Sequence, residues 1–148
     1  MGTYTALDLE RFTRKIGPLL ETGCLTWLGW HNGSGYACFD AGSRSDGTRR
    51  KVRAHRIMWE IARGDIPEGM QVDHLCRNRG CINPKHLEIV TSRENTLRGE
   101  SPSAVAARRT ACIRGHDLTG ENLRIETYGG RSHRRCRTCH RDRVRASA

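Results

Sequence analysis

The sequence has little of three things: aromatic residues, lysine and long apolar runs. Two Phe, three Trp and three Tyr in 148 residues are too few for a large hydrophobic core. No apolar stretch approaches the roughly 20 residues that a membrane-spanning helix needs, and the N-terminal segment lacks the pattern of a signal peptide. These absences argue against a membrane role and predict a cytoplasmic protein. Its fold should need a source of stability in addition to the burial of apolar side chains.

The basic residues are almost all arginine: 23 Arg stand beside three Lys, and the formal net charge is +10. Residues 108–148 hold eleven Arg against four acidic residues, so much of the excess lies towards the C-terminal end. Guanidinium groups match phosphate geometry, which predicts a polyanionic partner, although a GC-rich coding sequence or a solvated basic face would give the same composition. The residues that we expect to contact nucleic acid are Arg44, Arg49, Arg50, Lys51, Arg134, Arg135 and Arg137.

Cys76, Cys81 and His86 follow one another at C-x4-C-x4-H spacing, which suits a loop that brings thiolates and an imidazole onto one Zn²⁺. A tetrahedral structural site needs a fourth ligand, and Cys24 and Cys38 are the cysteines outside the evident clusters. We favour Cys24 because it follows a glycine at the mouth of an aromatic strand. Cys38 lies in the middle of a predicted strand, where a small buried hydrophobic residue is the simpler interpretation.

A second group of metal-ligand residues lies downstream, and we expect it to form a zinc ribbon or knuckle. Its C-x3-H and C-x2-C halves are Cys112, His116, Cys136 and Cys139. His133 or His140 could replace His116, and a redox-active C-x2-C is the alternative, but a redox motif expects a βαβ setting that is absent. Two such sites would use six of the seven cysteines as reduced thiolates and leave the holo-protein at a net charge of about +8.

Asp73, His74 and Asn95 supply a different chemistry. A neutral imidazole with a pKa near 6.5 is suited to deprotonate water, and His74 lies two residues before the first zinc ligand of its loop. Neighbouring strand residues point to opposite faces, so Asp73 and His74 serve one site only at a strand end or bulge. Thr91 and Glu94 form a capping-box pattern that begins a short helix carrying Asn95. Carboxylate and amide oxygens together suit Mg²⁺.

The residues described above combine into one pattern, His74-Leu-Cys76-x4-Cys81-x-Asn-Pro-x-His86-Leu-x7-Asn95. This pattern closely resembles the core of the HNH, or ββα-metal, endonucleases. Within that superfamily it looks most like the zinc-bearing His-Cys box homing endonucleases and the related HNH proteins of phages. The resemblance implies that His74 is the general base, that Asn95 binds Mg²⁺, and that Cys24 completes the first zinc site. Asp73 matches the acidic metal ligand of other HNH branches. His86 occupies a position that is Asn in many HNH motifs, and in those motifs the Asn orients the base.

The function implied by this resemblance is hydrolysis of double-stranded DNA with one Mg²⁺ ion and two structural zinc ions. An Arg normally clamps the phosphate in this superfamily, and Arg53 and Arg56 are the candidates, between which the spacing does not choose. Pairing of two copies, the target sequence, and a role in homing, packaging or restriction all stay open. The expected location is the cytosol of a bacterium or of a phage-infected host.

The expected fold is α+β: a small zinc-stabilised ββα-metal fold with an antiparallel sheet and a C-terminal appendage resembling a zinc ribbon. We predict an HNH core over residues 1–99, a linker over 100–111 and a basic zinc-binding segment over 112–148. Leu9, Phe12, Ile16 and Leu19 predict a first amphipathic helix interrupted or ended at Gly17-Pro18. A three-stranded meander and a second helix with Ile57, Met58 and Ile61 inward should follow, over residues 25–30, 35–40, 49–53 and 54–63.

Two other functions remain open from the sequence. A zinc-stabilised DNA-binding module without cleavage would explain the charge and both cysteine clusters, but would leave His74 and Asn95 without a role. A binder of RNA or of any nucleic acid would call for exposed aromatic residues. We assign Trp27, Trp30 and Tyr36 to the core instead.

Overall fold

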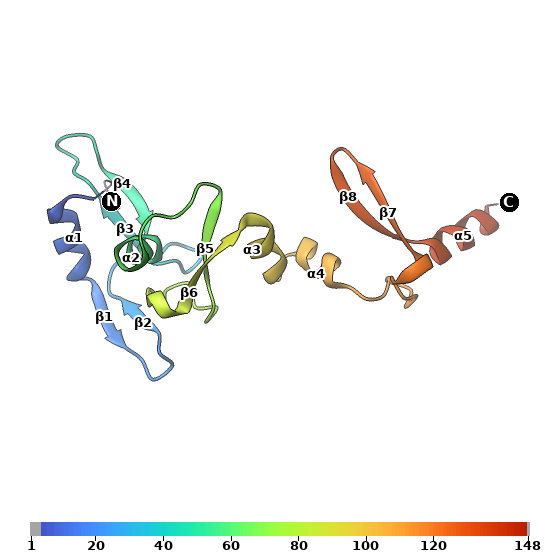
Figure 1. The fold of residues 1–148 in the computed structure, drawn as a ribbon, viewed down its shortest axis with the longest axis horizontal. Coiled ribbons are helices and arrows are strands. Elements are labelled where there is room, and N and C mark those ends of the chain that lie inside the picture. The colour runs from blue at the N-terminus through green and yellow to red at the C-terminus, as the bar shows by residue number, and fades with distance from the viewer. Residues whose placement is uncertain (1–3, 148) are drawn as a thin grey trace. The chain divides into compact units, whose positions relative to one another are not determined.

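The computed structural model describes residues 4–147 and divides into two compact units (Figure 1). The N-terminal unit is Met1–Asn95 and the C-terminal unit is Thr96–Ala148. The class is α+β, as predicted, with short helices and small antiparallel sheets. The predicted boundaries at residues 99 and 111 stay predictions about which pieces fold by themselves.

The N-terminal unit begins with helix α1 (Ala6–Thr13), which is fixed by a capping box between Thr5 and Asp8. Asp8 is buried and also accepts a hydrogen bond from the backbone N–H of Gly42 at 2.9 Å. The prediction that Ile16 and Leu19 continue this helix is wrong. They belong to strand β1 (Ile16–Leu19), because the Gly-Pro pair within it cannot continue a helix.

The strands of the described residues form four separate two-stranded antiparallel sheets, and two of these sheets take the place of the predicted meander. Strand β2 (Leu25–Trp27) pairs with β1, and β3 (Cys38–Ala41) pairs with β4 (Arg50–Arg53). The three strands predicted in this region are present in shorter form. The first of them, β2, pairs with the preceding strand β1 rather than with the following strand β3. The sequence pattern predicted where the strands lie but not which strands pair with one another.

Helix α2 (Ala54–Arg63) follows β4 directly and ends at Gly64, as predicted. Ile57 and Met58 face a core that is centred on Phe12, whose ring lies 4.8 Å from that of Trp27. The prediction that Ile61 faces inward is wrong, because 43% of this residue is exposed. The buried core cluster consists of Phe12, Trp27, Ala37, Phe39, Ala41, Ala54, Ile57, Met58 and Ile82.

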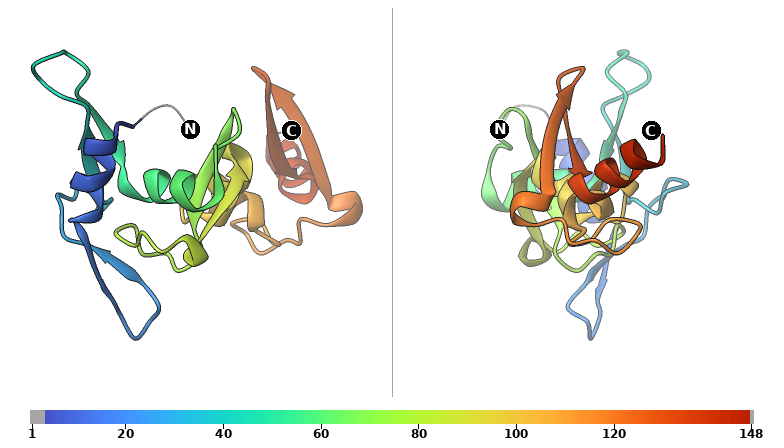
Figure 2. Two further views of the ribbon diagram at one scale, coloured as in Figure 1. Left: turned by 60° about the vertical axis from the view of Figure 1, so that its left-hand side comes forward. Right: turned by 90° about the vertical axis from the view of Figure 1, so that its right-hand side faces the viewer.

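A hairpin and the first residues of a helix complete the N-terminal unit and form the ββα element. Strand β5 (Met70–His74) pairs with β6 (Leu87–Thr91) without a bulge, and the loop between them contains the short 3-10 helix η1 (Pro84–His86). Helix α3 (Ser92–Arg98) follows β6, and Figure 2 shows it immediately after the hairpin. The capping box predicted for its start is present: the N–H of Glu94 donates to the Thr91 hydroxyl at 3.1 Å, and the Glu94 carboxylate accepts from the Thr91 N–H at 2.9 Å.

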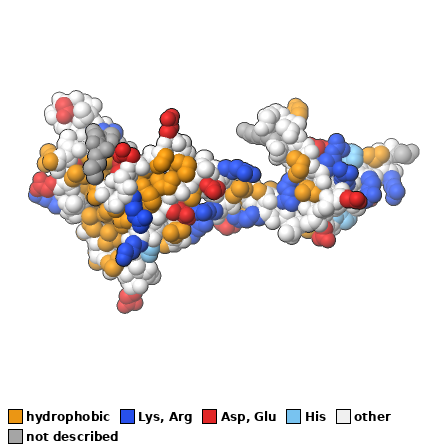
Figure 3. Space-filling model, in the orientation of Figure 1, with side chains coloured by type: hydrophobic (Ala, Val, Ile, Leu, Met, Phe, Trp, Pro, Cys, Tyr) orange, Lys and Arg blue, Asp and Glu red, His pale blue; other side chains and the backbone are white. Residues whose placement is uncertain are grey.

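The C-terminal unit contains helix α4 (Pro102–Arg108), the 3-10 helix η2 (Gly120–Asn122), a hairpin and a last helix. The hairpin pairs β7 (Leu123–Tyr128) with β8 (Arg131–Cys136) in regular register, and α5 (Arg137–Ala146) follows at once. On the face of the molecule in Figure 3, Lys and Arg side chains gather over this unit. Among the described residues, no helix has the length and hydropathy that crossing a bilayer would require.

Candidate active site and zinc centres

His74 is the last residue of β5, and only 4% of it is exposed. Its Nε2 lies 3.0 Å from the carbonyl oxygen of Cys81. A carbonyl oxygen can only accept, so Nε2 carries the proton and donates, and Nδ1 keeps its lone pair. The loop that contains the zinc-ligand candidate Cys81 therefore orients an imidazole with its proton-accepting nitrogen free for a general base.

The electrostatic surroundings favour the neutral form of this imidazole. Burial lowers the pKa of His74, and the nearby Arg79 guanidinium acts in the same sense. The hydrogen bond with Cys81 and the Asp73 carboxylate act in the opposite sense without reversing the shift. A base must be unprotonated to accept a proton, so this environment keeps His74 competent at neutral pH.

Asp73 precedes His74 at the end of β5, the position at which two neighbouring strand residues can serve one site. Asp73 accepts the backbone N–H of His74 at 2.8 Å and lies 3.6 Å from the Arg77 guanidinium. Gln71 shares its strand face, and Asn95 Nδ2 donates to Gln71 Oε1 at 2.6 Å. Because the amide nitrogen of Asn95 faces Gln71, its Oδ1 is left for a cation. A carboxylate oxygen and an amide oxygen on one face are a donor set that fits Mg²⁺.

The first cysteine cluster brings together Cys24, Cys76, Cys81 and His86, all with ligand atoms within 4.8 Å of one another. His86 Nδ1 lies 3.7 Å from Cys24 Sγ and 3.8 Å from Cys81 Sγ. Tetrahedral Zn²⁺ with ordinary bond lengths separates such ligand pairs by about 3.6–3.8 Å. The cluster could hold zinc, and it includes Cys24 rather than Cys38, which lies buried in β3.

Two residues beside the first cluster explain how Cys24 reaches a loop far along the chain. Gly23 has φ +75, which favours glycine, and a Cβ built there would lie only 3.0 Å from His86 Nε2. Asn83 donates from Nδ2 to the Gly23 carbonyl at 2.6 Å, and its backbone N–H points at Cys81 Sγ at 3.4 Å. Burial opposes ionisation of Cys24, but hydrogen bonds involving Thr22 and His86 outweigh it and lower its pKa to about 7.

The second cluster brings together Cys112, His116, Cys136 and Cys139, and it could also hold zinc. Cys112 Sγ lies 3.6 Å from both Cys139 Sγ and His116 Nδ1, and Cys136 Sγ lies 3.7 Å from His116 Nδ1. The sulfur separation is far beyond the roughly 2.05 Å of a disulfide, and all seven cysteines are free. His116, rather than His133 or His140, occupies the histidine position.

Asn122 supports the second cluster in a way that the sequence did not indicate. Its side-chain oxygen accepts from the N–H and the hydroxyl of Thr138, both at 2.9 Å, and its amide nitrogen lies 3.5 Å from Cys136 Sγ. The backbone N–H of Cys139 is the largest influence on Cys136 and helps to lower its pKa to about 6. Cys136 is therefore prepared to ionise, as a zinc ligand must.

Two arginines gather at an aromatic ring beside His74. Tyr36 lies 6.2 Å from the His74 ring, and the guanidiniums of Arg53 and Arg79 lie 4.5 and 5.3 Å from its centroid. Arg79 also donates to the Ser34 carbonyl at 3.1 Å. Tyr36 is half-buried and bridges these cations, and Arg79 was missed because its only sequence signal was its place in the zinc loop.

The predicted nucleic-acid contacts of the N-terminal unit lie on and beside β4. Arg44 is exposed in the turn before the strand. Arg49 pairs with Asp40 at 2.8 Å, and the Arg50 guanidinium lies 5.4 Å from the centroid of the Tyr4 ring. Lys51 lies 4.0 Å above the Trp30 ring, which is 55% exposed, so the assignment of Trp30 to the core is wrong.

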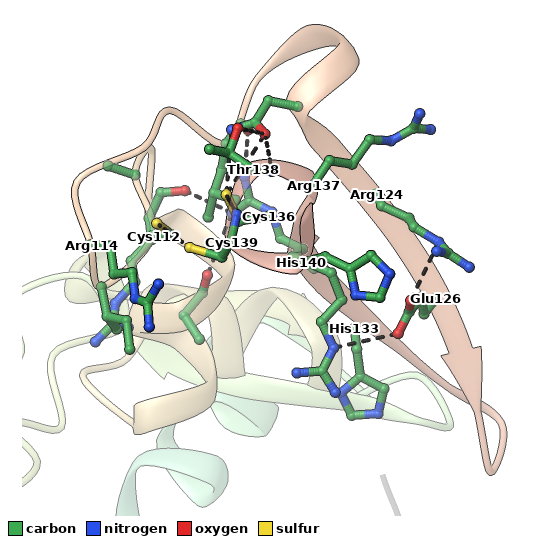
Figure 4. Close-up of a pocket in the computed structure, with 18 of the residues that line it drawn as sticks. Cys112, Arg114, Arg124, Glu126, His133, Cys136, Arg137, Thr138, Cys139 and His140 are labelled. Carbon is green, nitrogen blue, oxygen red and sulfur yellow. Dashed lines mark hydrogen bonds and ion pairs between the residues drawn. The ribbon is translucent and has the colours of Figure 1, made fainter. Parts of the chain in front are cut away.

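In the C-terminal unit a broad surface hollow is lined by the hairpin and α5 (Figure 4). Arg135 pairs with Glu126 at 3.4 Å, and the exposed Arg137 lies on the same hollow. The Arg134 guanidinium donates hydrogen bonds to four backbone carbonyls, at distances of 2.8–3.4 Å. They belong to Ala106, Ala107, Arg109 and Leu118. A DNA contact by Arg134 stays a prediction. The observed hydrogen bonds of Arg134 link separate segments of the C-terminal unit.

A sequence profile of the family described as HNH endonuclease matches residues 52–97, which extend from β4 into α3. This match includes the His74, Asp73 and Asn95 positions and the first zinc loop. It leaves out Cys24 and the whole second cluster, so these features come from the structure rather than from the profile.

Three phage proteins are similar to the chain. It is 35% identical over 80 residues to the "Uncharacterized gene 5.3 protein" of Enterobacteria phage T3, covering 53% of this chain and 79% of that protein. It is 34% identical over 73 residues to Protein 7.7 of Escherichia phage T7, covering 49% and 52%. It is 36% identical over 90 residues to Protein 2.8 of the same phage, covering 59% and 55%.

The chain spans most of the T3 relative but only about half of each T7 relative. No solved structure matches the chain significantly. The profile and the coverage of the T3 protein agree with the geometry of the ββα element and with the resemblance of its motif. The chain therefore belongs to the HNH endonuclease family.

Proposed function

We propose that the protein cuts DNA by hydrolysing phosphodiester bonds, with His74 as the general base and one Mg²⁺ bound by Asn95 and Asp73. The observation that carries the proposal is the hydrogen bond from His74 Nε2 to the Cys81 carbonyl, which leaves Nδ1 as the free base. A DNA-binding module without cleavage would have no use for a buried, oriented and neutral histidine at the end of the hairpin.

In the proposed reaction, Nδ1 of His74 removes a proton from a water molecule as its oxygen attacks the phosphorus. The bond between phosphorus and the 3′ oxygen breaks and the departing oxygen takes a proton from solvent water, so the products carry a 5′-phosphate and a 3′-hydroxyl. Mg²⁺, when bound, would stabilise the charge on the phosphate and on the departing oxygen. The zinc ions have no part in this step, because four protein ligands leave no position for water.

Arg53 is the better of the two predicted candidates for the phosphate clamp, and we add Arg79 to it. Both guanidiniums lie against Tyr36, which is a neighbour of the base. Arg56 lies near enough to both Tyr4 and His55 to act on their pKa values, but among the described contacts its guanidinium does not meet the Tyr36 ring. We propose that Arg53 and Arg79 leave the Tyr36 ring to bind phosphate oxygens, as planar guanidiniums do well.

The proposed partner is double-stranded DNA, and the organisms of the relatives support action in the cytoplasm of a phage-infected bacterium. Among the described residues, one ββα element carries the proposed base and metal ligands, so we expect one chain to cut one strand. We therefore expect nicking by the monomer. Two copies acting together, as in homing, would give a linear product instead.

The test is cleavage of supercoiled plasmid by the zinc-loaded protein with and without Mg²⁺. We expect Mg²⁺-dependent conversion to nicked circles with 5′-phosphate ends, and loss of cleavage in Asn95→Ala with zinc content and DNA binding retained. Glu21→Ala, at an exposed turn residue of the same unit, is the control. DNA binding without any cut, over several divalent metals and DNA sequences, would favour the binding module.

A further inference from the structure

His55 lies beside the proposed base and has no role in the reaction described above. It is the second residue of α2, only 4% of it is exposed, and its ring meets the His74 ring edge to face with centroids 4.5 Å apart. The Tyr36 ring lies 5.9 Å away. His55 is therefore part of the same group of rings as the base.

The Nδ1 atom of His55 is buried and has no hydrogen-bond partner, and it is the one such side-chain nitrogen or oxygen among the described residues. A phenylalanine or leucine would fill this space without leaving a polar atom unsatisfied. Buried polar groups are almost always paired, and exceptions concentrate at functional sites. The unpaired nitrogen therefore lowers the stability of the free protein, and we expect it to have a hydrogen-bond partner in another state of the protein.

The surroundings of His55 identify the kind of partner. The Arg53 and Arg79 guanidiniums lie against its neighbour Tyr36, and no side chain caps the N-terminus of α2, which begins at Ala54. Cations and a helix N-terminus favour an anion. Burial, His74, Arg56 and Arg53 lower the pKa of His55 to about 3, so it is neutral at neutral pH and offers a hydrogen bond rather than a charge.

We propose that His55 is a second substrate-contacting histidine, whose Nδ1–H donates a hydrogen bond to a non-bridging oxygen of the scissile phosphate. The contact forms only with DNA bound, since Nδ1 is covered in the free protein. It rests on the proposed nuclease function and assigns one residue to its transition state. Because the donor is neutral, its loss should lower the cleavage rate far more than the affinity for DNA.

Three substitutions separate the nitrogen from the ring. Asn places its amide close to the Nδ1 position, Gln reaches the Nε2 position instead, and Phe keeps the ring without any nitrogen. Under single-turnover conditions on plasmid with Mg²⁺, we expect His55→Phe and His55→Gln to cleave about 100-fold more slowly than the wild type. His55→Asn should stay within about fivefold of it, with unchanged zinc content and DNA affinity in all three variants.

Wild-type cleavage by His55→Phe would overturn the proposal, as would a His55→Asn as slow as the Phe variant with zinc and DNA binding intact. A measurement on the wild type covers failure of the variants to fold. In protein with ¹⁵N-labelled histidine, the Nδ1 resonance of His55 should shift on addition of DNA without Mg²⁺, and an unchanged resonance would overturn the contact. Since this spectrum needs binding only, failure of the nuclease function, seen as an inactive wild type, is distinguishable from failure of the His55 contact.

Discussion

The N-terminal unit packs Phe12, Trp27 and Phe39 around a hydrophobic core, whereas in the described part of the C-terminal unit only Ala104 and Leu118 are buried hydrophobic residues. Each unit nevertheless has one cluster of three cysteines and a histidine. In the first unit the cluster lies beside an existing core, and its loop orients His74. In the second unit the cluster has no comparable hydrophobic core beside it. We therefore propose that the same ligand set positions the proposed base in one unit and, with zinc bound, replaces apolar burial in the other.

The largest effect that this comparison predicts is the response of the C-terminal unit to loss of zinc. Structural zinc contributes about 10–16 kcal/mol in small metal-dependent domains, more than the C-terminal unit can recover from two buried side chains. Cys139→Ser should remove hydrogen-exchange protection from residues 112–146 and leave that of α1 and α2 in place. Cys38→Ser, which changes the cysteine outside both clusters, is the control and should retain two zinc ions per chain. Protection of the hairpin in a protein without the second zinc would refute the comparison.

The next effect concerns catalysis. His86→Ala should release the first zinc, free the Cys81 carbonyl from its position and lower the cleavage rate by about 10–100-fold. The Phe12 core should stay folded, because its packing does not involve the ligands. Zinc content, near-ultraviolet circular dichroism and single-turnover cleavage measure the three outcomes. His31→Ala, at an exposed histidine of the same unit, is the matched control. Full activity with only the second zinc bound would show that the first zinc does not orient the base.

A smaller effect separates two adjacent arginines. Arg134 donates to four backbone carbonyls, so Arg134→Ala should destabilise the C-terminal unit by about 1.5–3 kcal/mol. Arg135 is exposed and pairs only with Glu126 among the described contacts, so Arg135→Ala should change stability little and weaken DNA binding. Urea unfolding and electrophoretic mobility shifts measure the two effects. Equal stability of the two variants would remove the structural role given to Arg134.

The smallest effect is a dependence on pH in the N-terminal unit. His55 has its pKa lowered to about 3, while in the unfolded chain it binds a proton below about 6.5. The unfolded state therefore holds more protons between these values, and stability falls as pH falls through this window, by up to about 1.4 kcal/mol per unit. His55→Phe should gain about 2 kcal/mol on the wild type between pH 6.5 and pH 5. Measuring the difference between the two proteins cancels zinc release, which both share, and parallel stability curves would contradict the prediction.

The sequence predicted most of what is close together along the chain. The ligands Cys76, Cys81 and His86 and the capping box at Thr91 lie in one short stretch, so their spacing carries their geometry. The second cluster was likewise marked by its two short motifs. Cys24 required a judgement between two cysteines, because no local spacing links it to the loop.

The sequence did not predict what depends on contacts between distant segments. Ile16 and Leu19 fit a helix by periodicity, but pairing with β2 makes them a strand. Arg79 meets Arg53 only because both lie against Tyr36, and Arg134 binds carbonyls, which have no sequence signature. Such contacts follow from the assembled fold rather than from the residue types involved.

The central claim is that the zinc loop holds His74 as the base of a DNA-cutting site. Its most direct test is the single-turnover cleavage rate of His74→Ala against wild type in Mg²⁺, with bound zinc and DNA affinity measured for both. We predict two zinc ions per chain and equal DNA binding in the two proteins, with cleavage by the variant reduced by about 10²–10⁴-fold. Equal cleavage rates in the two proteins would contradict the claim.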